Sequence, residues 1–132
     1  MSHMFSLESV HKSFTAETGT IEVLRDMTLN VDEGQFLCIV GPSGCGKTTL
    51  LKIMCGLEQP TSGKVLIKGV PPDPKVQKFG VIFQEESLLP WRNVKKNIEF
   101  GQELVNRKLS EELTAKYISM VGLSGFENYY PH

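Results

Sequence analysis

The sequence predicts an α/β fold, and the support comes from apolar patterning along its 132 residues. Between Phe5 and Val31 the apolar residues nearly alternate, which is typical of strands with one covered face. Residues 41–48 form a glycine-rich segment between a short apolar run and a helix-like run. In the last third of the chain, apolar residues recur at helical spacing. We therefore expect an antiparallel β subdomain, a strand–loop–helix core and the start of a helical subdomain, divided near residue 85.

The first strands are expected to form a hairpin-rich sheet. The apolar positions are 5, 7 and 10 in one segment and 21, 23, 27, 29 and 31 in the next, with a turn at Thr18-Gly19 between them. Residues 32–34, Asp-Glu-Gly, predict a second turn, and Phe36–Val40 predicts a buried strand soon after it. Residues 1–3 look like the remnant of an expression tag, which makes Met4 the natural start.

The glycine-rich segment carries the most specific motif of the chain. Residues 41–48 read Gly-Pro-Ser-Gly-Cys-Gly-Lys-Thr and complete the pattern G-x-x-x-x-G-K-[ST]. A strand before this pattern and a helix after it, here Thr49–Met54, indicate binding of a nucleoside triphosphate. Because glycines lack Cβ atoms, successive backbone N–H groups can turn inward around a phosphate at the positive end of the helix. Lys47 is then expected to reach the β- and γ-phosphates, and Thr48 to ligate Mg²⁺.

The segment after this motif predicts a helix and then two further strands. Apolar residues at positions 50, 51, 54 and 57 lie at helical spacing, and Gly56 is placed to end the helix. Lys64–Gly69 and Phe79–Phe83 predict strands, separated by a stiff proline-rich loop at residues 71–74. Gln84 stands at the exit of the second of these strands.

The C-terminal part, residues 85–132, is expected to be mostly helical. Glu85–Arg92 is interpreted as a loop, and Asn93 as the N-cap of a first helix. A second helix is expected to start at Ser110, where two glutamates complement the helix dipole. Its predicted apolar stripe consists of Leu113, Tyr117, Met120 and Val121.

Composition and charge argue against several classes of protein. The net charge is −1, so no basic field marks the chain as a partner of nucleic acid. The longest apolar run, Phe36–Val40, is far shorter than the roughly 20 residues of a membrane-spanning helix, and we expect a cytoplasmic protein. The three cysteines lack C-x-x-C spacing, which argues against disulfides and a zinc site. Cys38 and Cys55 are expected in the core, while Cys45 is either a tolerated small residue or a thiol whose oxidation blocks the loop.

Several segments together resemble the ATP-binding cassette of ABC transporters. They are Leu24–Leu29, Gly41–Leu51, Gly56–Gly63 and Val81–Gln84. Residues 88–98 are most similar to the ATPase subunits of importers of the nitrate, sulfonate and taurine group. The resemblance covers residues 5–132 and implies the N-terminal half of a P-loop NTPase fold of the ABC ATPase type. Residues 4–84 would form the ATP-binding β subdomain and P-loop core, and residues 85–132 the Q-loop and a partial helical subdomain.

The resemblance implies a role for each matching residue. Phe14 occupies the aromatic position that stacks on adenine, although a phenylalanine in a strand is also an ordinary core residue. Gln84 matches the glutamine of the Q-loop, whose side-chain oxygen contacts Mg²⁺ or the attacking water. The implied catalytic residues are thus Lys47 and Gln84, and the implied Mg²⁺ ligands are Thr48 and Gln84. The residues implied to bind ATP are Phe14, Gly41, Ser43, Gly44, Cys45, Gly46, Lys47, Thr48 and Thr49.

The same resemblance implies protein partners and a location. An integral membrane permease would contact the Glu85–Asn93 loop, a second ATPase subunit would complete a dimer, and the protein would lie at the inner face of the cell membrane. Leu88, Leu89 and Trp91 are expected to expose an apolar patch, which usually marks a partner site. For Trp91 alone, packing between the two subdomains is the open alternative.

Some motifs that complete such an ATPase do not occur in these 132 residues. The family signature, L-S-G-G-Q, follows a Pro-His pair similar to Pro131-His132, and an apolar strand ending in Asp-Glu and a switch histidine come later. Phosphoryl transfer to water needs a group that orients the nucleophile and a carboxylate that fixes Mg²⁺. We therefore expect this polypeptide alone to bind ATP weakly and to hydrolyse it negligibly. The absent segment also supplies central parallel strands, so open sheet edges are expected to favour self-association.

Two other interpretations stay open. A non-catalytic nucleotide-binding module would be stabilised by ATP without turnover. A small P-loop kinase would need a lid rich in arginine, whereas Arg25, Arg92 and Arg107 are the only arginines of the chain. The sequence also leaves open whether it is a cloned N-terminal part of a normal ATPase or the product of a gene interrupted after residue 132.

Overall fold

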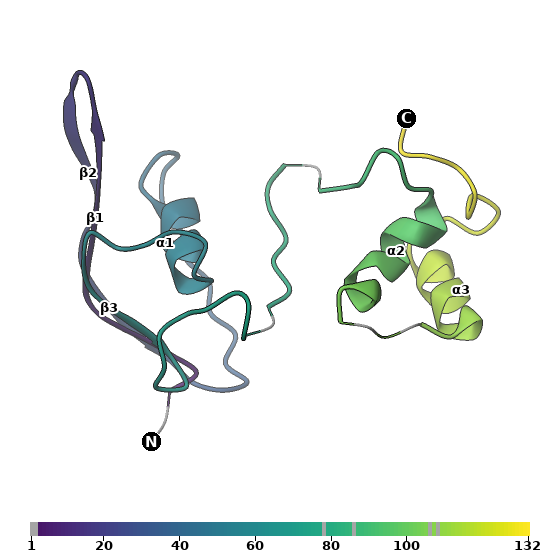
Figure 1. The fold of residues 1–132 in the computed structure, drawn as a ribbon, viewed down its shortest axis with the longest axis horizontal. Helices are drawn as coiled ribbons and strands as arrows, with labels where there is room; N and C mark the ends of the chain where they lie inside the picture. Colours follow the sequence, from purple (N-terminus) through teal and green to yellow (C-terminus); the bar gives the residue numbers. More distant parts are fainter. Residues whose placement is uncertain (1–2, 78, 86, 106, 108) are drawn as a thin grey trace. The chain divides into compact units, whose positions relative to one another are not determined.

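The computed structural model describes residues 3–132 with the exception of 78, 86, 106 and 108. Two of the predicted tag residues and Glu86 of the predicted partner loop therefore lie outside the described residues. The chain forms two compact units, residues 1–80 and 81–132, and this division falls near the predicted boundary. The first unit contains β1 (Phe5–Ala16), β2 (Gly19–Val31), α1 (Lys47–Met54) and β3 (Ser62–Ile67) (Figure 1). The second contains α2 (Val94–Glu103) and α3 (Glu111–Met120).

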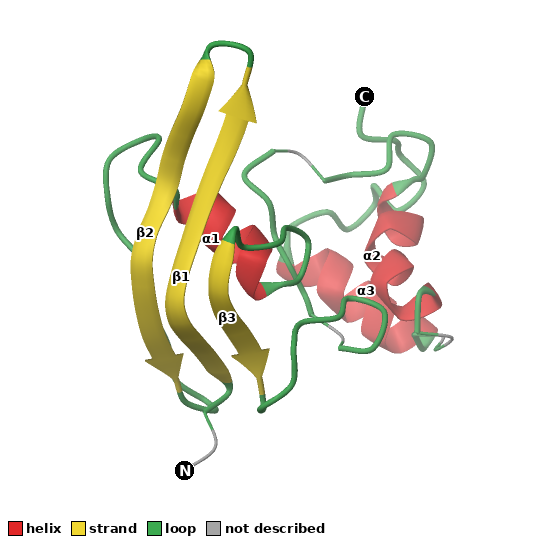
Figure 2. Cartoon of the chain, turned by 60° about the vertical axis from the view of Figure 1, so that its left-hand side comes forward, coloured by secondary structure: helices red, strands yellow, loops and turns green. Residues whose placement is uncertain are grey.

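The strands of the first unit form one antiparallel sheet with the order β2-β1-β3, which Figure 2 shows side by side. Leu7 lies at the centre of the register, opposite Leu29 of β2 and Val65 of β3. The register shifts after Leu7 in the pairing with β2 and after Glu8 in the pairing with β3, next to Ser9, which has a φ of 44°. Gly63 meets this bulge so closely that a Cβ atom would lie 2.3 Å from the Ser9 carbonyl oxygen. Glycine at position 63 therefore lets β3 join the sheet beside an irregular β1.

Helix α1 packs on one face of this sheet and closes the core of the first unit (Figure 2). Leu50, Ile53 and Met54 follow the i, i+3, i+4 spacing of a helical face, so all three point to the same side. They are buried together with residues of all three strands, namely Leu7, Val10, Leu24 and Val65. The helix ends as predicted at Gly56, whose φ of 72° allows the Leu57 N–H to donate to the Lys52 carbonyl over 2.9 Å.

The second unit is built on the helices α2 and α3, and both the predicted N-cap at Asn93 and the predicted helix start at Ser110 are confirmed. The Asn93 side chain accepts from the Lys96 N–H over 2.9 Å, and the Ser110 hydroxyl accepts from the Leu113 N–H over 3.2 Å. The two helices are joined by the buried Thr114, which donates to a Glu99 carboxylate oxygen over 3.1 Å. In the part of the chain that the structure describes, no helix has the length and hydropathy to cross a membrane.

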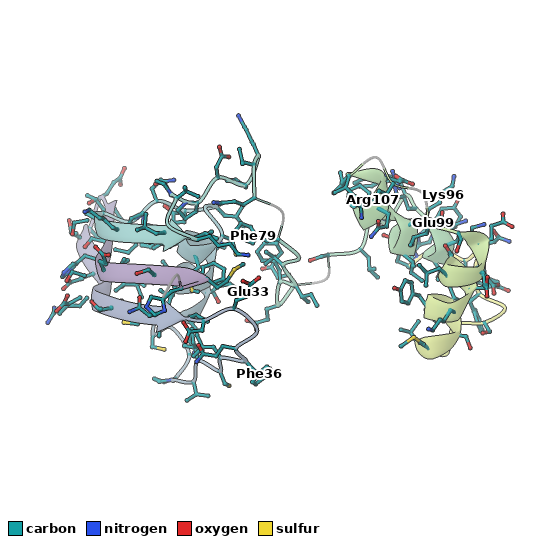
Figure 3. All side chains as sticks on the ribbon, turned by 90° about the horizontal axis from the view of Figure 1, so that it is seen from below. Glu33, Phe36, Phe79, Lys96, Glu99 and Arg107 are labelled. Atoms are coloured by element: carbon teal, nitrogen blue, oxygen red, sulfur yellow. The ribbon has the colours of Figure 1, made fainter. Side chains whose placement is uncertain are left out.

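Two of the predicted strands are wrong. Residues 36–40 and 79–83 are not strands in the structure, and Phe36 is 93% exposed (Figure 3). Such short apolar runs are typical of strands paired on both sides, and a strand exists only where a neighbour accepts its backbone hydrogen bonds. Among the described residues, the only sheet is the antiparallel one of β1, β2 and β3. The burial predicted for Cys38 is wrong for the same reason, since this residue is exposed, whereas Cys55 is buried as expected.

The predicted apolar stripe of the last helix is also wrong. Thr114 and Ile118 are the buried residues of α3, while Tyr117, Met120 and Val121 are exposed. The predicted stripe and the buried stripe are neighbours on the helix surface. Apolar spacing alone favoured the predicted one, because the buried one includes the polar Thr114. The hydrogen bond to Glu99 satisfies the Thr114 hydroxyl, which is why a polar residue occupies the buried face.

Candidate functional site

The glycine-rich segment forms an exposed loop that leads from residue 40 into α1. Gly44 and Gly46 have φ angles of 79° and 98°, in the left-handed region that favours glycine. Gly46 also lies directly against β2, since a Cβ atom there would be 2.9 Å from the Val23 carbonyl oxygen. At Gly41, a Cβ atom would be 2.8 Å from the Cys45 sulfur. The glycines at 41 and 46 therefore allow close approaches, whereas the glycine at 44 supplies only a backbone conformation.

The N-terminus of α1 is open to an anion. Its N-cap is Gly46, which has no side chain to accept from the first helical N–H groups, in contrast to Asn93 and Ser110 of the other helices. Its first turn, Lys47-Thr48-Thr49, contains no carboxylate. The positive end of the helix dipole and several unmatched backbone donors thus coincide with the exposed loop. A phosphate group would satisfy both.

Lys47 places its positive charge on this loop. Its ammonium donates to the carbonyl oxygens of Gly41 and Pro42 over 2.8 and 2.7 Å, and lies 3.6 Å from the Cys45 sulfur. These carbonyls are neutral acceptors, and a phosphate oxygen would be a stronger, charge-assisted acceptor for the same ammonium. The arrangement therefore combines backbone donors and one flexible cationic side chain on a single short segment, which suits a polyphosphate.

Phe14 lies near the hairpin end of β1 with 42% of its surface exposed. Its distance from the glycine-rich loop follows from the strand register. A Cβ atom at Gly46 would lie 2.9 Å from the Leu24 side chain, and Leu24 is the register partner of Lys12. Phe14 is two residues further along β1 than Lys12. At a rise of about 3.3 Å per residue, Phe14 is roughly 7 Å beyond that contact. The structure thus brings Phe14 to the part of the sheet that meets the end of the loop.

Gln84 is exposed and belongs to the second unit, whereas Lys47 and Thr48 belong to the first. Its joint role with these residues stays a prediction. Among the described residues, no cluster of three or more His, Cys, Asp or Glu side chains is arranged to hold a metal ion. The Thr48 hydroxyl and the Gln84 amide oxygen are nevertheless the hard oxygen ligands that Mg²⁺ prefers, and Mg²⁺ usually takes its other ligands from substrate phosphates and water. Each of the two side chains, taken by itself, therefore has the donor atom of a Mg²⁺ ligand.

The predicted partner loop presents apolar side chains. Trp91 is 72% exposed and Leu88 56% exposed, while Leu89 is half-buried. Exposure of Trp91 within its own unit agrees with a contact surface. The backbone of this loop is held by Asn97, whose amide donates to the carbonyls of Leu89, Arg92 and Asn93 and whose oxygen accepts from the Leu89 N–H.

Sequence reasoning missed Asn97 and also Lys12. The ammonium of Lys12 is almost buried, donates to a Glu58 carboxylate oxygen over 2.6 Å and to the Gln59 carbonyl over 2.8 Å, and lies 4.7 Å from the centre of the Phe14 ring. One signal was available: Val10, Lys12 and Phe14 alternate along one strand, and a lysine on an otherwise apolar face requires a partner. For Asn97 we see no comparable signal in the sequence.

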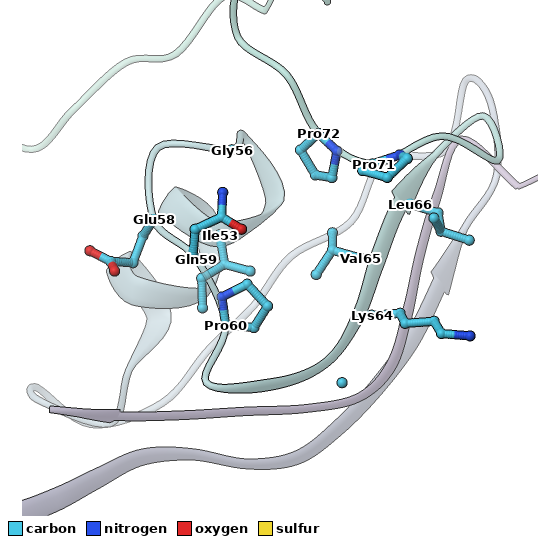
Figure 4. A pocket seen from close by; sticks show the side chains of 11 residues that line it. Ile53, Gly56, Glu58, Gln59, Pro60, Lys64, Val65, Leu66, Pro71 and Pro72 are labelled. Carbon is cyan, nitrogen blue, oxygen red and sulfur yellow. The ribbon is translucent and has the colours of Figure 1, made fainter.

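A cavity of about 500 Å³ lies between the C-terminal end of α1 and β3 (Figure 4). Its lining includes Ile53, Pro60, Val65 and Pro72. The glycine-rich loop stands at the opposite end of α1 and does not line it. The candidate site therefore depends on exposed backbone donors rather than on a deep pocket, and we assign no function to this cavity.

Comparison with known proteins identifies the family. A family model described as ABC transporter matches residues 24–131, and the chain therefore belongs to the ABC transporter family. An uncharacterised ABC transporter ATP-binding protein of Methanocaldococcus jannaschii, MJ0412, is 45% identical over 128 residues, which are 96% of this chain and 48% of that protein. The aliphatic sulfonates import ATP-binding protein SsuB of Bacillus cereus is 38% identical over 126 residues, or 96% of this chain and 50% of the relative. The taurine import ATP-binding protein TauB of Yersinia pestis is 42% identical over 109 residues, or 81% and 43%. The chain thus spans about half the length of these curated relatives.

Solved structures confirm the predicted fold. The ATP-binding cassette MJ0796, in a dimeric post-hydrolysis state bound to ADP and Pi, matches with a TM-score of 0.82 and 30% identity. The match covers 97% of this chain and 62% of that chain. The chain therefore has the fold of an ABC ATPase cassette in incomplete form, as the resemblance of its segments to that family implied.

Proposed function

We propose that these residues are the N-terminal part of the ATP-binding subunit of an ABC importer, and that the loop Gly41–Thr48 binds MgATP. One observation carries the proposal: the uncapped N-terminus of α1 and the Lys47 ammonium meet on the same exposed loop. In this role the N–H groups of the loop and Lys47 hold the phosphates, and Phe14 stacks on adenine. Thr48 and Gln84 would hold Mg²⁺, which supplies charge neutralisation at the phosphates.

We further propose that the importer takes up a small solute of the sulfonate or taurine kind. The support is the names of the relatives, which are import proteins for aliphatic sulfonates and for taurine, together with the similarity of residues 88–98 to that importer group. The solute itself would bind a permease and not this subunit. The subunit would accordingly be cytoplasmic and peripheral at the inner face of the membrane, and it would act with a second ATPase subunit.

The permease contact is proposed for the Glu85–Asn93 loop. Leu88 and Trp91 supply exposed apolar surface, and the four hydrogen bonds of Asn97 hold the loop backbone in one conformation before a partner arrives. A pre-organised loop loses less conformational entropy on binding, which favours association. Glu85, Ser87 and Arg92 of the loop are polar, as expected for the rim of an interface.

The 132-residue polypeptide alone is proposed to bind ATP without measurable turnover. The sequence contains Lys47 and Gln84 for the phosphates and Mg²⁺, but neither an apolar strand that ends in Asp-Glu nor the family signature occurs in it. Without a carboxylate to fix the metal and a group to orient water, binding energy is not converted into phosphoryl transfer.

Thermal unfolding with and without MgATP tests this proposal. ATP at ten times its Kd contributes about 1.4 kcal/mol of stability, which for a chain of this size raises Tm by roughly 4 °C. Lys47→Ala should remove most of this shift, whereas Lys52→Ala, an exposed lysine on the same helix, should retain it. Phosphate release is measured on the same samples. No shift with the unchanged chain would refute nucleotide binding, and release that depends on Lys47 would refute the proposed lack of turnover.

A further inference from the structure

Lys12 joins two parts of the first unit that sequence reasoning treated separately. Its ammonium lies 4.7 Å from the centre of the Phe14 ring, within the range of a cation–π contact. The same ammonium donates to Glu58 over 2.6 Å and to the Gln59 carbonyl over 2.8 Å. One face of the ring is thus covered by a cation that two acceptors hold in place. Phe14 is nevertheless 42% exposed, so the cation does not bury the residue.

The acceptors of Lys12 are themselves held firmly against β1. Thr61 donates its N–H to the His11 carbonyl over 2.9 Å, and its hydroxyl accepts from the Ser13 N–H over 3.0 Å. At the other side, the N–H groups of Leu57 and Glu58 donate to the Lys52 carbonyl at the end of α1. The segment that fixes Lys12 is therefore anchored both to the strand and to the helix whose first residue is Lys47.

We propose that Lys12 is a positioning residue for the nucleotide base: it fixes the Phe14 ring and leaves the opposite ring face to a purine. This inference rests on the proposed function and adds a residue to it. A cation on one face draws π-electron density toward itself, which makes the other face a better partner for an electron-rich base. Through Glu58, the orientation of this stacking surface is also linked to the helix that begins at the phosphate-binding loop.

The competing explanation is that Lys12 only stabilises the fold. Two ligands distinguish this role from the positioning of the Phe14 ring. MgATP carries the base, whereas magnesium tripolyphosphate carries only the phosphates. Titration calorimetry of the 132-residue chain with each ligand separates the contribution of Phe14 from that of the loop. Lys12→Met should lower the affinity for ATP by about three- to tenfold, between the values of an exposed and a desolvated cation–π contact, and should leave the affinity for tripolyphosphate unchanged.

Matched variants sharpen the result. Lys12→Arg keeps a cation over the ring and should bind ATP within about twofold of the unchanged chain. In a Phe14→Leu background, Lys12→Met should cause no further loss of ATP affinity, because the ring it positions is gone. Should Lys12→Met fail to fold by circular dichroism, Glu58→Gln replaces it, since the amide oxygen would still accept from Lys12 but the counter-charge would be removed. Because a neutral acceptor holds the Lys12 ammonium less firmly, Glu58→Gln should weaken the binding of ATP by about twofold and leave the binding of tripolyphosphate unchanged.

The outcomes separate the two proposals. Equal losses for ATP and tripolyphosphate, or no loss for either, overturn the role of Lys12 and leave the loop assignment intact. A full additional loss in the Phe14→Leu background also overturns it. An unchanged chain that binds neither ligand overturns the proposed nucleotide site, and the role of Lys12 with it.

Discussion

Substitution of Gly46 tests whether the loop is held against the sheet. Two costs add in Gly46→Ala. A Cβ atom at a φ of 98° costs about 1–2 kcal/mol, and a contact of 2.9 Å with the Val23 carbonyl oxygen adds about 1–3 kcal/mol, because a backbone atom cannot move aside as a side chain can. We expect a loss of about 2–5 kcal/mol in the free energy of unfolding.

Gly44→Ala is the matched control for this prediction. Gly44 also has a left-handed φ, 79°, but a Cβ atom there would meet nothing within 4 Å. The control should therefore lose about 1 kcal/mol, from backbone conformation alone. Urea unfolding followed by far-UV circular dichroism measures both losses. Tryptophan fluorescence would not report on the first unit, because Trp91, the only tryptophan, lies in the second unit. Equal losses for the two variants would refute the argument that the loop packs on β2 at Gly46.

Three further predictions concern single contacts. Asn97→Ala should lower the unfolding free energy of the second unit by about 1–3 kcal/mol, because backbone groups of the partner loop lose their hydrogen bonds. Urea unfolding followed by Trp91 fluorescence measures this loss as a lower midpoint. An unchanged midpoint would contradict the role of Asn97 as the support of the partner loop. The Lys12 ammonium lowers the pKa of Glu58, so the stabilisation is present above the ordinary glutamate pKa of about 4.3 and is lost as the pH falls through the lower folded-state pKa. Glu58→Gln should flatten the decline of Tm in that acid range, and an identical pH profile would speak against the ion pair. Thr114→Val should destabilise the helix pair by about 1 kcal/mol in chemical denaturation because Glu99 loses its donor, and a gain in stability would show that the hydrogen bond is unimportant.

The parts of the fold that sequence predicts well are those set by neighbours in the chain. The caps at Asn93 and Ser110 depend on an N–H three residues away, and the stop at Gly56 on a left-handed φ that glycine adopts freely. The turn and the helix of the glycine-rich motif are similarly local, since they follow one another within residues 41–54. Local signals of this kind place the elements before any tertiary contact is known.

The parts that sequence does not predict depend on distant residues. The run Phe36–Val40 has the apolar character of a buried strand, but its state depends on neighbouring strands that local patterning does not reveal. The ion pair of Lys12 and Glu58 joins residues 46 apart, and it exists because α1 returns the chain to the edge of β1. Asn97 satisfies four backbone groups of a loop whose conformation has no sequence signature.

Helix α1 is the element on which the candidate site depends as a whole. Its first turn carries Lys47 and the open N–H groups, its middle buries Leu50 and Ile53 against the sheet, and its C-terminal exit leads to Glu58, which holds Lys12 under Phe14. A shift of α1 on the sheet would therefore move the phosphate-binding loop and the support of the stacking ring together. It follows that core substitutions such as Leu50→Ala, at a side chain buried against the sheet, should weaken ATP binding more than tripolyphosphate binding. For ATP two separate contacts must keep their spacing, and for tripolyphosphate only one.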